Sequence, residues 1–318
     1  MNATSRSAGS QSSSRLQARR ARELLQPKLL AQLGSLELVA KTVVDGFFTG
    51  MHRSPFFGFS QEFAEYKAYN DGDDPRYIDW NVYARTDRTY IKRYLGETNT
   101  AINLIVDVSA SMGYSSGDIS KLQYAKFVCA TLAYLARKQH DAAGATLFDD
   151  QIREIVPPAS HPDTLYRILA LLERTQASSG TQISDSLQHI SSTLRKRGMI
   201  FLMSDFYCDT EVLKRNLEVM AQHGHEVALF HILDAGELEP VGIKEMRTPS
   251  TLRDLETGTE VKVTADFMRE EYPARIAAHI AALEKIALRC GCAYVPCNTA
   301  QPLDEVIRQF LLTRQQQR

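Results

Sequence analysis

The sequence lacks any run of about 18 or more consecutive apolar residues, the length that a membrane-spanning helix requires. The first residues also lack the apolar core of a secretory signal. Both absences predict a cytoplasmic chain without a membrane span. The 318 residues carry a formal net charge of only −1, so no global field favours nucleic acid or an anionic membrane as a partner.

Cysteine is scarce, with five residues in the chain, and no CxxC pair is present. Cys290, Cys292 and Cys297 have the spacing C-x-C-x4-C, whereas a structural zinc site usually needs four ligands in paired motifs. We interpret these three as small thiols packed around a late strand in a reducing compartment. Cys129 lies in a helical apolar pattern and is expected in the core.

Catalytic signatures are also missing from the sequence. It contains no GxxxxGK[ST] phosphate loop, which argues against intrinsic ATPase activity, and no GxSxG elbow around a serine. The histidines show no spacing that nominates a general base, and we expect most of them at the surface or in loops. These absences favour a protein that is not an enzyme.

The first hundred residues divide into two parts. Residues 1–22 are rich in Ser, Gln and Arg without an acidic side chain, which predicts a disordered basic tail; a mitochondrial transit peptide has a similar composition. Residues 23–100 begin with a helical pattern and continue with short strands and turn-rich loops. We expect them to form a smaller N-terminal subdomain.

From residue 101 onwards, strand patterns alternate with helix patterns. The runs "AINLIVDVS", "MIFLMSDF" and "EVALFHILD" resemble buried strands, and "KLQYAKFVCATLAYLARKQ" has helical apolar spacing. This alternation predicts an α/β fold, a doubly wound, mostly parallel Rossmann-type sheet with helices on both faces, over residues 101–318. A hairpin insertion is expected near residues 245–264, around Thr257 and Gly258.

Three helix boundaries are predicted from capping residues. We expect Asp163 to cap the helix of "DTLYRILALLERTQ" and Thr210 to cap that of "TEVLKRNLEVMAQHG". Gly198 is expected to end the helix of "QISDSLQHISSTLRKRG".

Polar side chains follow the carboxyl ends of two predicted strands. Asp107, Ser109 and Ser111 follow one strand, and Asp205 follows another. Ligands of open parallel sheets bind beyond these ends, and Thr181, just before a helix, is expected at the same edge. Five oxygen donors without His or Cys predict a site for Mg²⁺, with Mn²⁺ or Ca²⁺ as alternatives. A helix cap is the simpler alternative for Asp107.

This pattern resembles the metal-ion-dependent adhesion site of von Willebrand factor A domains. The matching residues are Asp107, Ser109, Ser111, Thr181 and Asp205. The resemblance implies that the first four surround the ion and that Asp205 acts through water. It also implies that an acidic side chain of a protein partner completes the site, and it gives the main sheet a von Willebrand A-like fold.

The upstream segment resembles the signature of a bacterial family catalogued as domain of unknown function fifty-eight. Its core "GDDPRYIDW" is followed by Ala84 and Arg85, and the resemblance extends from about residue 34 to the C-terminus. Tyr66 and Lys67 depart from the arginine that is common in the family, and the membrane helices of many members are missing. The family implies work with a MoxR-type AAA+ ATPase in chaperone-like assembly or maturation of protein complexes.

The charged residues of this motif allow two interpretations. They are Gly72, Asp73, Asp74, Arg76, Asp79, Trp80 and Arg85. We favour a salt-bridged loop that is clamped against the sheet and anchored by Trp80. A docking surface or a second acidic metal site is the alternative; Pro75 and a missing final Glu spoil a calcium-loop pattern.

Two functions follow from these residues. The first is a non-enzymatic, metal-dependent protein-interaction module, without nucleic acid as a partner. The alternative is a Mg²⁺- or Mn²⁺-dependent hydrolase of phosphoesters. Ser109 occupies the position where a haloacid-type enzyme would carry its second acid, and a general base near the metal would discriminate the two functions.

Overall fold

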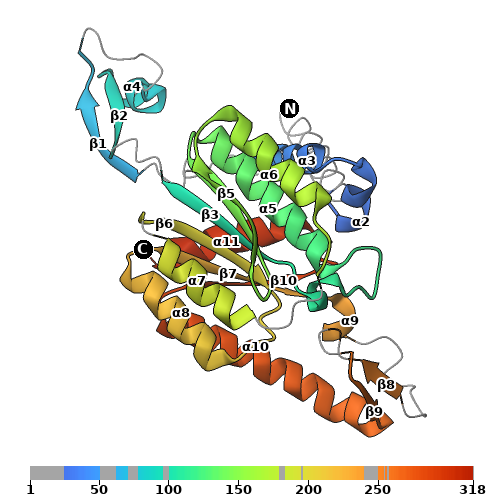
Figure 1. Ribbon diagram of the computed structural model, residues 1–318. Helices are drawn as coiled ribbons and strands as arrows, with labels where there is room; N and C mark the ends of the chain where they lie inside the picture. The colour runs from blue at the N-terminus through green and yellow to red at the C-terminus, as the bar shows by residue number, and fades with distance from the viewer. Residues whose placement is uncertain are drawn as a thin grey trace, which may run out of the picture.

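The structure is a computed structural model, and Figure 1 shows its arrangement. The predicted tail, Thr181, and the motif residues Gly72, Asp73, Asp74 and Arg76 lie outside the residues that it describes. The described residues are 25–50, 62–70, 78–95, 100–178, 183–194, 196–239, 250–253, 255 and 258–317.

A six-stranded sheet forms the centre of the molecule (Figure 1). Its spatial order is β10-β7-β6-β3-β4-β5, and all neighbours are parallel except the antiparallel pair β4 and β5. The strands are β3 (Ala101–Asp107), β4 (Ala142–Phe148), β5 (Ile152–Ala159), β6 (Gly198–Ser204), β7 (Glu226–Leu233) and β10 (Ala293–Asn298).

Counted in chain order, these six strands follow the sequence 3-2-1-4-5-6, the order of a doubly wound α/β sheet. The predicted fold class is therefore confirmed. The order reverses between β3 and β6, which are paired in register from Ala101 opposite Gly198 to Val106 opposite Met203. Crevices at such a reversal are where these sheets bind ligands.

Helices cover both faces of the sheet, and alternate strand residues face each layer. Leu104 and Val106 of β3 join one apolar core, whereas Ile105 joins the other, as the two-residue period of a strand requires. The helices contributing to the first core are α2 (Pro27–Leu30), α3 (Leu36–Gly50), α5 (Lys121–Lys138), α6 (Pro162–Arg174) and α11 (Leu303–Gln317). Those contributing to the second are α7 (Ile183–Thr193), α8 (Thr210–Gln222) and α10 (Tyr272–Arg289).

The helices of the described ranges are all too short or too polar to cross a lipid bilayer. Short elements complete the chain. They are the 3-10 turns η1 (Ala31–Leu33) and η3 (Ala110–Gly113), the helix α9 (Ala235–Leu238) and the π-helical turn η4 (Phe267–Glu271).

Two hairpins stand away from the main sheet (Figure 1). In the first, β1 (Glu62–Ala68) pairs antiparallel with β2 (Tyr90–Leu95), and α4 (Trp80–Thr86) lies between them in sequence; we call these three elements the arm. The second hairpin pairs β8 (Ser250–Arg253) with β9 (Glu260–Val263), within the predicted insertion.

The helix boundaries differ from the predictions. His161 is the N-cap of α6, and its ring accepts from the Asp163 amide at 3.3 Å. Asp209 caps α8 instead of Thr210, because its carboxylate reaches two amides of the first turn. Gly198 does not end α7 but begins β6, where a Cβ would lie 2.1 Å from the Ala101 carbonyl oxygen. A close backbone approach therefore requires that glycine.

The late cysteines pack into the apolar layers, as the sequence indicated. Cys297 belongs to one core and Cys292 to the other, with Cys290 packed against the latter. Side chains on opposite faces of a sheet cannot share one tetrahedral ion. Burial also raises the pKa of the Cys292 thiol to about 12, so in the absence of a metal this thiol is protonated.

Candidate metal site

The loop after β3 places Asp107 at the point where the strand order reverses. The carboxylate is fully buried and accepts two hydrogen bonds, from the Ser109 amide at 2.9 Å and from the Ser204 hydroxyl at 2.5 Å. The Ser109 and Ser111 hydroxyl oxygens lie 3.2 Å apart. The alternation of Asp107, Ser109 and Ser111 thus gathers three oxygen-bearing side chains within one short turn.

The end of β6 contributes Ser204 and Asp205 from the neighbouring strand. Ser204 joins the two loops, since its hydroxyl donates to Asp107 and accepts from the Phe206 amide at 2.9 Å. Phe206 has a φ of 53°, a left-handed conformation that turns the chain sharply after the strand. Asp205 is 2% exposed. The structure therefore brings Asp107, Ser109, Ser111 and Asp205 to one edge of the sheet.

The charges of the two buried carboxylates, Asp107 and Asp205, repel each other. Burial, followed by the charge of Asp205, raises the pKa of the Asp107 carboxyl to about 7. Like charges close together at low dielectric disfavour joint ionisation. A divalent cation bound between them would remove that penalty.

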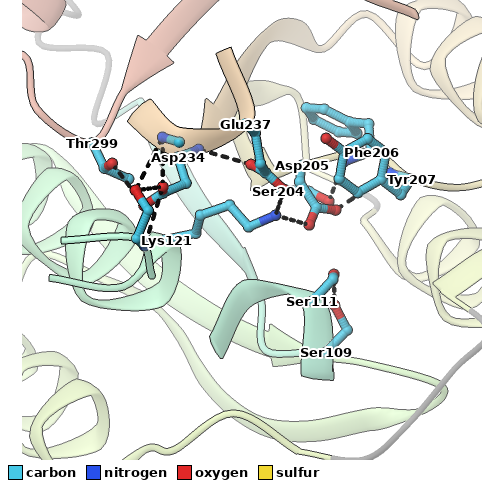
Figure 2. Close-up of polar contacts among 12 residues, drawn as sticks. Ser109, Ser111, Lys121, Ser204, Asp205, Phe206, Tyr207, Asp234, Glu237 and Thr299 are labelled. Carbon is cyan, nitrogen blue, oxygen red and sulfur yellow. Dashed lines mark hydrogen bonds and ion pairs between the residues drawn. The ribbon is translucent and has the colours of Figure 1, made fainter. Parts of the chain in front are cut away.

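A cation of the chain itself already reaches this edge. Figure 2 shows the Lys121 side chain extended to Asp205 and Glu237, and its ammonium lies 2.8 Å from a carboxylate oxygen of each. Burial alone would lower the pKa of Lys121, but the two carboxylates raise it above its ordinary value. The ring of Tyr207 lies 5.0 Å from the ammonium and adds a cation–π contact.

Sequence reasoning missed Lys121 and Glu237. Lys121 is the first residue of α5, after the N-cap Ser120, where a positive charge opposes the helix dipole. This misfit was the available signal in the sequence. The partner Glu237 lies 116 positions away, and nothing in its local sequence points to Lys121.

Glu237 is held in place by a network around Asp234. The Glu237 carboxylate accepts from the Asp234 amide at 2.8 Å, and the Asp234 carboxylate accepts from the Gly236 amide at 2.8 Å and the Thr299 hydroxyl at 3.1 Å. This capping box fixes the short helix α9. The Ser116 hydroxyl also donates to Asp234, which connects α9 to the loop before α5.

Thr181 lies outside the described residues; Ser178, the last described residue before it, is bonded near the site. The Ser178 amide donates to the Val108 carbonyl at 2.7 Å, and the Ser178 hydroxyl donates to Asp149. Ser178, three positions before Thr181, is therefore beside the loop that carries Ser109.

The donor set fits a hard cation. Two carboxylates and two hydroxyls present oxygen atoms, as Mg²⁺ and Ca²⁺ prefer. Within the described part of the chain, no group of three or more His, Cys, Asp and Glu is placed to hold a metal, so a site at this edge would need the serine hydroxyls beside its two carboxylates. The charges also fit, because the carboxylates of Asp205 and Glu237 share the single ammonium of Lys121.

The histidines fall into two groups. His140, His161, His189 and His223 are exposed, as predicted. Contrary to the prediction, His225 is buried beside the Leu194 carbonyl and His231 is fully buried on β7. Burial, with His279 nearby, lowers the pKa of His231 to about 3. The His231 Nδ1 pairs with the Tyr294 hydroxyl at 2.7 Å, so this ring is a neutral part of the core.

The described residues of the GDDPRYIDW motif contradict the interpretation that Trp80 anchors a loop against the sheet. Trp80 is 63% exposed and stacks edge-on against Tyr83, so it does not anchor a loop against the sheet. Asp79 is the buried residue: it accepts from the Tyr66 hydroxyl at 3.0 Å and from the Val82 amide at 3.2 Å. Arg85 lies in the last turn of α4 and is exposed.

Fold and site together define a doubly wound α/β domain with hard oxygen donors at its topological switch point. The family described as "Protein of unknown function DUF58" matches residues 65–282. The chain therefore belongs to this family, which confirms the resemblance found in the sequence.

The curated relative described next is named as uncharacterized. The uncharacterized protein Rv1480 of Mycobacterium tuberculosis is 26% identical over 292 residues, which cover 91% of this chain and 90% of that protein. Among solved structures, the conserved hypothetical protein BatB of Bacteroides thetaiotaomicron is 14% identical, with a TM-score of 0.42, over 68% of this chain and 99% of BatB. The SpRpn10 VWA domain is 13% identical, with a TM-score of 0.39, over 66% and 94%. Such remote similarity carries no functional argument, and the fold class rests on the strand order.

Proposed function

We propose that this protein is a metal-dependent protein-interaction module. Mg²⁺, or Mn²⁺ or Ca²⁺ in its place, is held by Asp107, Ser109, Ser111 and Thr181, with Asp205 acting through water. The bound ion supplies an electrophilic position for a carboxylate of a protein partner. The observation that carries the proposal is the convergence of two buried carboxylates and two hydroxyls at the reversal between β3 and β6.

The number of charges supports a binding role for the ion. Two carboxylates near a divalent ion only balance its charge, so an ion that Asp205 contacts through water remains electrophilic. An Asp or Glu side chain from outside can then complete the shell. Because Lys121 of α5 and Glu237 of α9 meet Asp205 or its ammonium partner at this edge, the protein partner would contact both the ion and these elements.

We infer the cellular setting from the family. A MoxR-type AAA+ ATPase, or a client of that ATPase, is the proposed source of the acidic residue. The protein would then act in the cytoplasm, in chaperone-like assembly or maturation of protein complexes. Hydrolysis of phosphoesters is the alternative activity, and no observation within the described residues favours it.

Calorimetric titration with MgCl₂ tests the metal site. We expect wild type to bind and Asp107→Ala to lose measurable binding, because the central carboxylate is gone. Asp118→Ala is a matched control in the next loop, since Asp118 is exposed and pairs only at the surface with Lys28. Equal affinity of wild type and Asp107→Ala would contradict the site.

Capture of a purified MoxR-type ATPase from the same organism tests the partner. We expect capture in MgCl₂ and its loss in EDTA or with Asp107→Ala. Capture that is insensitive to the chelator would count against metal-bridged docking. Turnover of p-nitrophenyl phosphate by wild type would favour the hydrolase instead.

A further inference from the structure

The buried ammonium of Lys121 is a charge for which the proposed function has no use so far. Its side chain is 1% exposed and lies between Asp205, 2% exposed, and Glu237, 12% exposed. Both contacts measure 2.8 Å, so the ammonium is shared between a candidate metal ligand and a residue outside the ligand set.

We propose that Lys121 is an internal competitor of the metal ion. In the metal-free chain its ammonium neutralises Asp205; when a divalent ion binds, the ammonium is retained by Glu237 and Asp205 turns to the ion. Lys121 is thus a positioning residue that sets the affinity of the site. The inference rests on the proposed metal site and adds a regulator to it.

The first argument is electrostatic. A buried positive charge that contacts Asp205 repels a divalent ion bound beside the same carboxylate, and at low dielectric such repulsion is strong. Burying an ammonium carries a desolvation cost. A role of Asp205 as a metal ligand alone does not account for a lysine buried against it.

The second argument is that Glu237 offers the ammonium an alternative partner. Glu237 belongs to the capping box of α9, where its other carboxylate oxygen accepts from the Asp234 amide at 2.8 Å. Asp234 is held in turn by Ser116 and Thr299. A carboxylate fixed in this way can keep the ammonium without following Asp205.

The inference makes opposite predictions for removing the ammonium and for removing its alternative partner, Glu237. Lys121→Met removes the competing charge, and we expect Mg²⁺ to bind about tenfold more tightly or better. Glu237→Gln leaves the ammonium with Asp205 as its remaining carboxylate contact, and we expect weaker Mg²⁺ binding than in wild type. A purely structural role would weaken binding in both variants.

The experiment is calorimetric titration of the full chain with MgCl₂, with the Mg²⁺-induced rise in melting temperature as a second readout. Lys138→Met is the matched control, because Lys138 lies on the same helix and pairs with Asp45 at 2.9 Å in an exposed position; its affinity should equal that of wild type. Unchanged or weaker binding by folded Lys121→Met would overturn the inference. If that variant does not fold, Glu237→Gln decides, and tighter binding there would overturn it.

Failure of the proposed function gives a different result. If wild type binds no Mg²⁺ but Lys121→Met does, Lys121 replaces the ion in the native chain; the competitor role is then supported and the metal-dependent function is not. If neither binds, both proposals are wrong.

Discussion

The edge of the main sheet and the arm both bury an aspartate, but they hold it in opposite ways. At the sheet edge, Asp205 pairs with Lys121 across 84 positions of sequence, and Asp107 bonds to Ser204 across 97. In the arm, Asp79 bonds to Tyr66, 13 positions away, and to an amide in the first turn of its own helix. Asp107 and Asp205 also accept from amides two positions away, but only at the sheet edge do further bonds connect the aspartates to distant parts of the chain.

This difference predicts how each region opens. A polar network that connects strands and helices from distant parts of the chain can break only when much of the fold opens with it. A network within one hairpin and one short helix can open alone, as a local unit of low stability. Substitutions at the sheet edge should therefore change global unfolding, and those in the arm should change local exchange.

The largest expected effect is a loss of unfolding free energy when the buried lysine is substituted, measured in EDTA so that no metal is bound. Lys121→Met leaves the Asp205 and Glu237 carboxylates without their ammonium, which costs about 3–5 kcal/mol of unfolding free energy for a buried pair. Lys138→Met removes an exposed lysine–aspartate pair from the same helix, which costs about 0–1 kcal/mol. Urea denaturation followed by circular dichroism measures both, and equal losses would show that the sheet edge is no more constrained than the surface.

A pH dependence of the metal-free protein sharpens the comparison further. The pKa of Asp107 is raised to about 7 by burial and then by Asp205, so the folded chain keeps a proton that the unfolded chain loses near pH 4. The stability from that proton is complete below about pH 4 and is lost as the pH rises through about 7.

Asp107→Asn isolates this contribution, because the amide does not titrate. In EDTA, we expect the unfolding free energy of wild type to fall relative to that of the Asn variant between about pH 4 and about pH 7. Urea denaturation across this range measures the difference. A constant difference would mean that Asp107 is ionised throughout and that the buried charges are already balanced.

The sequence predicted the sheet because its signals are local and repeat along the chain. Apolar runs alternate with amphipathic helices, and parallel strands must then meet at one edge. Asp107 and Asp205 could be placed together for that reason alone. The helix caps at Asp163 and Thr210 were assigned wrongly, because the helices begin earlier: His161 accepts from the Asp163 amide, and Asp209 accepts from the amides of Glu211 and Val212.

The rest of the site could not be predicted, because its partners are chosen by packing. Lys121 meets Glu237 only when α5 and α9 both lie beside β6, and no sequence period connects them. The predicted role of Trp80 as an anchor was wrong. A lone tryptophan suggests a buried anchor, yet this side chain is on the exposed side of a short helix. Exposure depends on what covers a helix, and the arm stands apart from the main sheet (Figure 1).

The smallest expected effect lies in the arm, where Asp79→Ala removes an acceptor for the Val82 amide and the Tyr66 hydroxyl. Loss of such a cap costs about 1 kcal/mol, and we expect faster hydrogen exchange in α4, β1 and β2 while the exchange of β3 and β6 stays as in wild type. Asp79→Asn keeps one acceptor oxygen and should restore much of the protection. Exchange that accelerates equally in the main sheet would mean that the arm and the sheet unfold as one unit, and the contrast between local and long-range anchoring would then be wrong.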